Sequence, residues 1–154
     1  GPMGQMLHIF AEHTCRTTFD LVEHIKRQFP RQLANGMVTC YPDASGSHAS
    51  TSSTESDHDI LRSAGIKVVA ERRNPPVSET IAHANLHIHA GTVLINPTTC
   101  YETVQSLETW GYDDNYKPMK GGKNDLSHAG DGVRYLIWQT MPRAVAQMNR
   151  PRWR

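Results

Sequence analysis

The sequence has few cysteines, no long apolar run and almost no net charge, and each shortage excludes a class of protein. Its three cysteines, Cys15, Cys40 and Cys100, are widely spaced and form no Cys-x-x-Cys pair. We therefore expect neither a disulfide framework nor a cysteine-based zinc site, and a reducing cytosol as the environment. No segment approaches the roughly 20 apolar residues of a membrane helix, and no charged-then-apolar leader opens the sequence. We accordingly expect no membrane among its partners.

Charge is balanced over the whole chain, because 16 lysine and arginine residues face 15 aspartate and glutamate residues. Binding to nucleic acid would therefore depend on local basic patches. These are Arg72 with Arg73; Lys117 with Lys120 and Lys123; and Arg143, Arg150, Arg152 and Arg154 beside Trp153. Such patches are most often solvated surface, but several of them around a cleft lined by carboxylates would suit a phosphodiester substrate.

Several short motifs of enzymes are also missing. The sequence has no Gly-x-x-x-x-Gly-Lys-Ser/Thr loop and no Gly-x-Gly-x-x-Gly loop, so neither phosphate-binding motif is present. Ser45 lacks the Gly-x-Ser-x-Gly pattern of a nucleophile elbow. His83 and His87 have the i, i+4 spacing of a zinc helix, but the glutamate of His-Glu-x-x-His is missing. We interpret them as core or surface histidines rather than as metal ligands.

Strand-like and helix-like runs alternate along the chain, which predicts an α/β protein whose sheet is covered by helices. Strands are predicted over residues 6–11, 37–41, 67–71 and 92–95. Helices are predicted from Thr17 or Thr18 to Pro30, over residues 57–65, and from about residues 78, 99 and 127. Capping boxes are predicted at Thr54-x-x-Asp57 and at Thr99-x-x-Glu102.

The chain is expected to hold one domain. Residues 1–3 are typical of the remnant of a cleaved expression tag, and residues 4–142 form the predicted domain. Residues 143–154 form a basic tail. Residues 45–56, mostly serine and threonine, and the polar residues 111–124 are predicted to be loops.

Two carboxylates lie where a predicted strand ends. Asp43 follows the strand at residues 37–41, and Glu12 follows the strand at residues 6–11. Because chemistry in α/β sheets gathers at the carboxyl ends of the strands, both are candidate ligands of a divalent cation such as Mg²⁺ or Mn²⁺. The alternatives are an Asx turn at Asp43 and a solvated strand end at Glu12.

A third carboxylate, Asp131, lies near the start of the last predicted helix, where the helix dipole alone favours an acidic residue. It shares a polar side of that helix with His128, Arg134 and Tyr135. Such a side either lines a cleft or meets water. The apolar side is predicted to hold Ala129, Val133, Leu136 and Ile137.

Several segments, taken in order, are similar to a known family. They are Phe10-Ala11-Glu12; Tyr41-Pro42-Asp43-Ala44; Asp59 to Ile66 with Lys67-Val68-Val69; Leu94 to Pro97 with Leu107-Glu108 and Trp110 to Asp113; and His128-Ala129-Gly130-Asp131-Gly132-Val133-Arg134-Tyr135. The last is the most specific, since it resembles a closing His-Ala-x-Asp-Ala-x-Arg-Tyr signature. From about Leu7 to Trp138, the chain resembles the C-terminal nuclease domain of the large terminase subunit of tailed bacteriophages, the protein that packages viral DNA.

The resemblance implies a ribonuclease H-like fold, a mixed sheet flanked by helices, and an endonuclease that depends on Mg²⁺ or Mn²⁺. The family cuts concatemeric double-stranded DNA by hydrolysis with two metal ions, which activate water and stabilise the leaving oxygen. Its partners are the portal protein and the small terminase subunit. It acts in the host cytoplasm during virion assembly and is not a component of the mature virion.

The same resemblance assigns roles to particular residues. Asp43 and Asp131 are the expected catalytic acids and metal ligands, with Glu12 as a further ligand. Asp125 and His128 are expected behind those ligands, without contacting the ion. The residues expected to contact DNA phosphates are Lys117, Lys120, Lys123, Arg72 and Arg73.

The sequence departs from the family in two places. The family's first catalytic acid lies on an opening strand upstream of the Glu12 strand, and we expect this chain to lack that strand, its hairpin partner and the ATPase motor domain. Gly130 stands where some members carry another acid. The chain is therefore either an endonuclease or a catalytically incomplete fragment that binds DNA or the portal, with its basic tail as the contact. A Holliday-junction resolvase of the same fold class is a more distant alternative.

Overall fold

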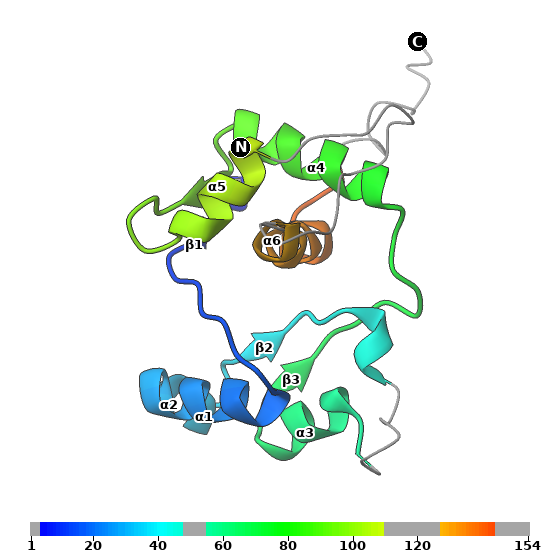
Figure 1. The fold of residues 1–154 in the computed structure, drawn as a ribbon. Coiled ribbons are helices and arrows are strands. Elements are labelled where there is room, and N and C mark those ends of the chain that lie inside the picture. Colours follow the sequence, from blue (N-terminus) through cyan, green and yellow to red (C-terminus); the bar gives the residue numbers. More distant parts are fainter. Residues whose placement is uncertain (1–3, 48–54, 110–126, 144–154) are drawn as a thin grey trace. The chain divides into compact units, whose positions relative to one another are not determined.

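The computed structural model describes residues 4–47, 55–109 and 127–143 (Figure 1). Helices and strands alternate along most of the chain, which confirms the α/β class predicted from the sequence. The elements are β1 (Leu7–Ile9), α1 (Thr18–Gln28), α2 (Pro30–Ala34), β2 (Thr39–Cys40), the short 3-10 helix η1 (Ala44–Ser47), α3 (Asp57–Ser63), β3 (Lys67–Val68), α4 (Val77–His89), β4 (Val93–Ile95), α5 (Tyr101–Thr109) and α6 (Ser127–Thr140).

The strands form two parallel pairs within the described ranges. β1 pairs with β4 in the register Leu7 to Val93, and β2 pairs with β3 in the register Thr39 to Lys67. Parallel neighbours need a crossover connection, and helices supply it in both pairs. The structure therefore has small parallel sheets with helical connections, while the finer ribonuclease H-like arrangement stays a prediction.

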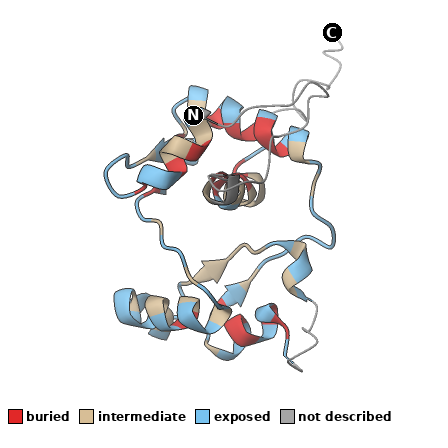
Figure 2. Cartoon of the chain, in the orientation of Figure 1, coloured by how far each residue is buried: buried red, intermediate tan, exposed pale blue. Residues whose placement is uncertain are grey.

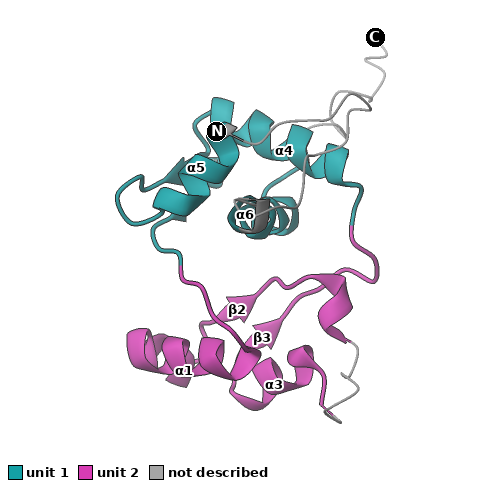
Figure 3. Ribbon diagram, in the orientation of Figure 1, with its two compact units in different colours: residues 1–12, 75–154 teal, residues 13–74 magenta. Residues whose placement is uncertain are grey.

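The chain divides into two compact units (Figure 3). Unit 1 comprises residues 1–12 and 75–154, and unit 2 comprises residues 13–74. Each unit has its own apolar core. The buried core of unit 1 contains Ile9, Ala84, Val93, Cys100, Val133, Ile137 and Met141, and that of unit 2 contains Val22, Ile60, Leu61 and Ile66.

In unit 2, the helices α1, α2 and α3 lie on one side of the β2–β3 pair (Figure 1). Helix α1 begins as predicted, because the Thr17 side chain accepts a hydrogen bond from the Asp20 N–H at 3.1 Å. It ends at Gln28, with Phe29 as the C-cap before Pro30, also as predicted. Pro30 in addition opens α2, since the first position of a helix needs no N–H donor.

The capping box of α3 is displaced by two residues from the predicted one. Ser56 and Asp59 form it: the Ser56 hydroxyl accepts from the Asp59 N–H, and the Asp59 carboxylate accepts from the Ser56 N–H. Asp57 instead accepts a hydrogen bond from the Thr18 hydroxyl at 2.7 Å. Thr54 lies outside the described residues. Both segments have the same spacing, so the local pattern could not choose between them.

In unit 1, α6 packs against α4 and α5. Buried positions are red on these helices in Figure 2. The α5–α6 contact is close at Gly130, whose N–H donates to the Ser106 hydroxyl at 3.1 Å. A Cβ atom at Gly130 would lie 2.6 Å from that hydroxyl oxygen. A side chain at this position would therefore require the Ser106 hydroxyl to move.

No helix in the described part of the chain is long and apolar enough to cross a membrane.

Candidate functional site

Asp43 lies just beyond the carboxyl end of β2, at the start of the turn formed by residues 43–47, which we call the Asp43 turn. Its Oδ1 accepts hydrogen bonds from the Ser45 N–H at 2.7 Å and from the Asn74 side-chain amide at 2.8 Å. Among the described residues, no hydrogen bond reaches Oδ2. The side chain is exposed, so this oxygen is open to a solvent-borne ligand.

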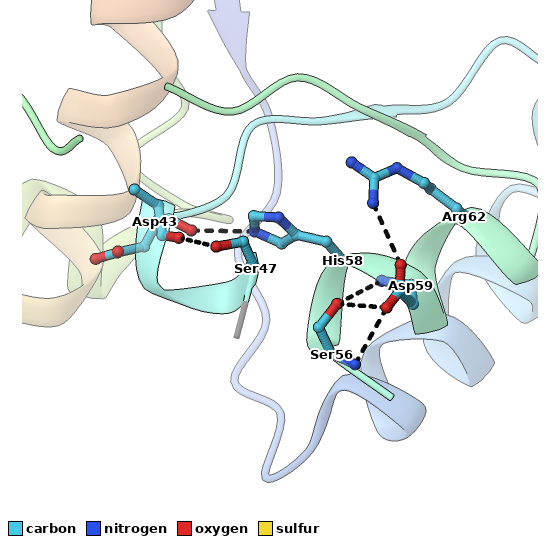
Figure 4. A network of polar contacts seen from close by, with 7 residues as sticks. Asp43, Ser47, Ser56, His58, Asp59 and Arg62 are labelled. Atoms are coloured by element: carbon cyan, nitrogen blue, oxygen red, sulfur yellow. Dashed lines mark hydrogen bonds and ion pairs between the residues drawn. The ribbon is translucent and has the colours of Figure 1, made fainter. Parts of the chain in front are cut away.

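Two further contacts hold the backbone of the Asp43 turn. The Ala44 N–H donates to the side-chain oxygen of Asn74 at 3.0 Å. Nε2 of the buried His58 lies 3.1 Å from the Asp43 carbonyl oxygen, and since a carbonyl only accepts, Nε2 carries the proton. In Figure 4 the imidazole faces the Asp43 carbonyl, while the carboxylate points away from it. The turn is thus fixed by Asn74, from the connection that follows β3, and by His58, from α3.

These contacts keep the Asp43 carboxylate charged. Partial burial alone would raise its pKa, but the hydrogen bonds from Asn74 and Ser45 and the nearby His58 outweigh that effect, and the pKa lies below its ordinary value. A charged carboxylate is the form that binds a hard divalent cation.

The Ser45 contact is an Asx turn, one of the two interpretations that the sequence left open. The Asx turn is compatible with a metal-ligand role for Asp43, because the Ser45 N–H donates to Oδ1 alone. A carboxylate has two oxygens and room for several partners. The metal-ligand role of Asp43 stays a prediction that this geometry allows.

Arg72 and Arg73 precede Asn74 on the connection between β3 and α4, and both are exposed. Because Asn74 contacts Asp43 directly, this connection brings two cationic residues into the neighbourhood of the Asp43 turn. Their predicted contact with DNA phosphates is compatible with this placement and stays a prediction.

Glu12 lies in unit 1 and binds the start of α5. One oxygen accepts from the Glu102 N–H at 2.7 Å, and the other accepts from the Thr103 N–H at 2.8 Å and from its hydroxyl at 2.6 Å. Burial alone would raise its pKa, but these hydrogen bonds lower it below its ordinary value. Glu12 therefore supplies the acceptors for two N–H groups that a helix start leaves without partners.

This contact corrects the predicted capping box at Thr99 and Glu102. The Thr99 hydroxyl donates instead to the Phe10 carbonyl at 2.5 Å. The acceptor for the helix start comes from Glu12, 90 residues away from Glu102. A local pattern cannot reveal a cap contributed from so far along the chain.

Asp131 lies in α6 and forms an ion pair with Arg134, one turn later. Arg134 also donates to the Thr80 hydroxyl of α4 at 2.5 Å. The side chain of Arg134 is 2% exposed and that of Asp131 is 19% exposed. The expectation of an open polar side is therefore wrong for Arg134, because a guanidinium can be buried where a carboxylate and a hydroxyl satisfy it.

Several predicted site residues cannot be placed. Lys117, Lys120, Lys123 and Asp125 lie outside the described residues, and so does the side chain of His128. Of the basic tail, Arg143 is described. Its guanidinium lies 3.6 Å from the centre of the Trp138 ring.

His83 and His87 of α4 are core residues, in agreement with their interpretation as core or surface histidines. His83 is 5% exposed, and its Nε2 has no hydrogen-bond partner among the described residues. Burial and then the neighbouring His87 lower its pKa. His87 contacts the Thr92 hydroxyl and the Pro142 carbonyl, each at 2.8 Å. No group of three potential metal-ligating side chains is present in the described part of the chain.

Two residues that shape the Asp43 turn were missed by the sequence analysis, Asn74 and His58. Asn74 precedes two prolines and was interpreted only as part of a turn. Its partner Asp43 is 31 residues away, on the connection that follows the other strand of a parallel pair. The rule that polar side chains gather at the carboxyl ends of parallel strands was the one signal that could have pointed to it.

Comparisons of the chain with family models, curated proteins and solved structures found no match. The resemblance to terminase nuclease domains therefore relies on the motifs within this sequence.

Proposed function

We propose that this chain is the nuclease domain of a large terminase subunit, with a ribonuclease H-like fold, and that it cuts concatemeric double-stranded DNA with Mg²⁺ or Mn²⁺. One observation supports this most: Asp43, at the end of a parallel strand, is held in place with one carboxylate oxygen open. In the same proposal the portal protein and the small terminase subunit are its partners, in the host cytoplasm during assembly.

Asp43 is suited to serve as one ligand of a hard divalent cation. Asp43 offers a charged, exposed carboxylate whose Oδ2 accepts no hydrogen bond from the described residues. When bound, two such ions supply an activated water and stabilise the leaving oxygen of the phosphodiester. In this proposal Asp43 and Asp131 are each a metal ligand, and Arg72 and Arg73 bind the DNA backbone.

Plasmid cleavage tests this function. We expect the wild-type chain to cut with Mn²⁺ or Mg²⁺ and not with EDTA, and Asp43→Asn to lose cutting because the neutral amide binds the cation weakly. Asp20→Asn is the matched control: Asp20 is another exposed aspartate of unit 2, on α1. Equal cutting by Asp43→Asn and wild type would contradict the assignment of Asp43.

One observation favours a second candidate, a catalytically incomplete fragment that binds DNA or the portal. Glu12 is a predicted metal ligand, but both of its oxygens accept hydrogen bonds at the start of α5. This candidate predicts salt-sensitive DNA binding that EDTA does not change and that weakens when residues 150–154 are deleted. Fluorescence anisotropy with labelled duplex DNA separates it from the nuclease.

A further inference from the structure

The side chain of Asn74 contacts two neighbouring groups of the Asp43 turn at once. Its amide nitrogen donates to Oδ1 of Asp43 at 2.8 Å, and its oxygen accepts from the Ala44 N–H at 3.0 Å. A single planar amide thus spans the carboxylate and the next peptide group. Rotation of the Asp43 carboxylate would break the first of these hydrogen bonds.

We propose that Asn74 is a positioning residue for Asp43: it holds Oδ1 within the chain and thereby presents Oδ2 to a divalent cation. The inference rests on the proposed function, since it assigns to Asn74 a part in the metal site of which Asp43 is a ligand. Asn74 itself does not contact the ion.

The chemistry of the amide suits this task. An amide offers both a donor and an acceptor, and the turn requires one of each. An amide is also uncharged, so it orients the carboxylate without cancelling the negative charge that attracts the cation. A lysine or arginine at this place would compete with the ion for the carboxylate.

The remaining contacts of the turn do not replace Asn74. The Ser45 N–H also donates to Oδ1, but it belongs to the same turn and moves with it. His58 binds the Asp43 carbonyl and packs against Gly46, where a Cβ would lie 2.8 Å from its Nε2. His58 therefore fixes the backbone of the turn, whereas Asn74 is, among the described residues, the partner from outside the turn that donates to the carboxylate.

Asn74→Ala removes both hydrogen bonds and tests the inference. We expect the Mn²⁺ concentration needed for half-maximal binding and cleavage to rise about tenfold, the lower end of the loss in metal affinity when a hydrogen-bond partner of a ligand is removed. Cleavage at saturating Mn²⁺ should stay close to that of wild type, because the ligand itself remains. Free Mn²⁺ measured by electron paramagnetic resonance gives the binding curve without reference to DNA.

A second measurement follows Asp43 directly. Loss of the Asn74 donor should raise the pKa of the Asp43 carboxyl towards its ordinary value, as seen by carbon NMR of labelled protein. The acid limb of the cleavage profile should then move to higher pH. A merely structural role for Asn74 would change the melting temperature but not the Mn²⁺ requirement.

Asn74→Gln and Asn35→Ala are the companion variants. Glutamine keeps the amide on a longer stem, so its Mn²⁺ requirement should fall between those of wild type and Asn74→Ala. Asn35 is an exposed asparagine of the same unit that follows α2. Asn35→Ala should leave both the Mn²⁺ requirement and the pKa of Asp43 as they are in wild type.

The outcomes separate the two proposals. A higher Mn²⁺ requirement together with a raised Asp43 pKa in Asn74→Ala supports the inference. A wild-type Mn²⁺ requirement or an unchanged Asp43 pKa in that variant overturns it and leaves the nuclease proposal standing. A wild-type chain that neither binds Mn²⁺ nor cuts DNA overturns the nuclease proposal, and the metal role of Asn74 with it, before any variant is compared.

Discussion

The two predicted catalytic acids are held by opposite means in the two units. In unit 2, neutral donors bind Asp43: an asparagine amide and a backbone N–H. In unit 1, Asp131 is paired with a buried arginine. A neutral donor leaves the full charge of the carboxylate available to a cation, whereas an arginine shares that charge. The comparison teaches that Asp43 is built mainly for binding, while Asp131 also carries part of the packing of α4 and α6.

The largest expected effect is a loss in the free energy of unfolding when Asp131 is replaced, and it tests whether Asp131 carries part of the packing. Asp131→Ala leaves the guanidinium of Arg134 buried without its carboxylate, and we expect a loss of about 2–3 kcal/mol in the free energy of unfolding. Adding Arg134→Met should restore part of the loss, because it removes the buried charge. Urea unfolding followed by circular dichroism measures both. No loss in the single variant would show that Asp131 has no packing role.

Glu12 should give an intermediate effect and a distinct pH dependence. Glu12→Gln weakens the cap of α5, for which we expect a loss of about 1–2 kcal/mol at neutral pH. The folded-state pKa of Glu12 is depressed below its ordinary value of 4.5. Its stabilisation is therefore fully present above about pH 4.5 and is lost as the pH falls through the folded-state value. Urea unfolding at neutral pH and at about pH 3 should show that the variant and wild type converge in acid.

The smallest effect should come from Asp43, the exposed acid. Asp43→Ala removes hydrogen bonds at the surface of the turn, where water replaces them, so we expect a loss of no more than about 1 kcal/mol. Urea unfolding of Asp43→Ala gives the loss to compare with that of Asp131→Ala. A loss as large as that of Asp131→Ala would erase the distinction between a binding acid and a packing acid.

The sequence predicted the features that depend on neighbouring residues. The start of α1 at Thr17, its end before Pro30 and the place of α3 before Gly65 all follow from local chemistry, and the structure confirms them. Gly65 has a positive φ of 86°, the conformation that glycine adopts most readily.

Features that depend on distant partners could not be predicted in this way. The cap of α5 comes from Glu12, and the burial of Arg134 depends on Thr80 in another helix. The Asp43 turn, which follows β2, is held by Asn74 from the connection that follows β3. In each case the role of the side chain comes from a contact that forms only when the chain folds. The spacing of residues along the sequence therefore cannot predict it.

The division of the chain has a consequence for the order of folding. Unit 2 is one continuous stretch whose strands pair over a short separation, Thr39 with Lys67. Unit 1 is discontinuous, and its first strand waits for a partner far along the chain, Leu7 with Val93. Because closing a long loop costs entropy before any contact repays it, unit 2 should form first, both in refolding and as the chain leaves the ribosome. β1 then stays an unpaired edge until β4 has been made, and pulsed hydrogen exchange should find its amides protected last.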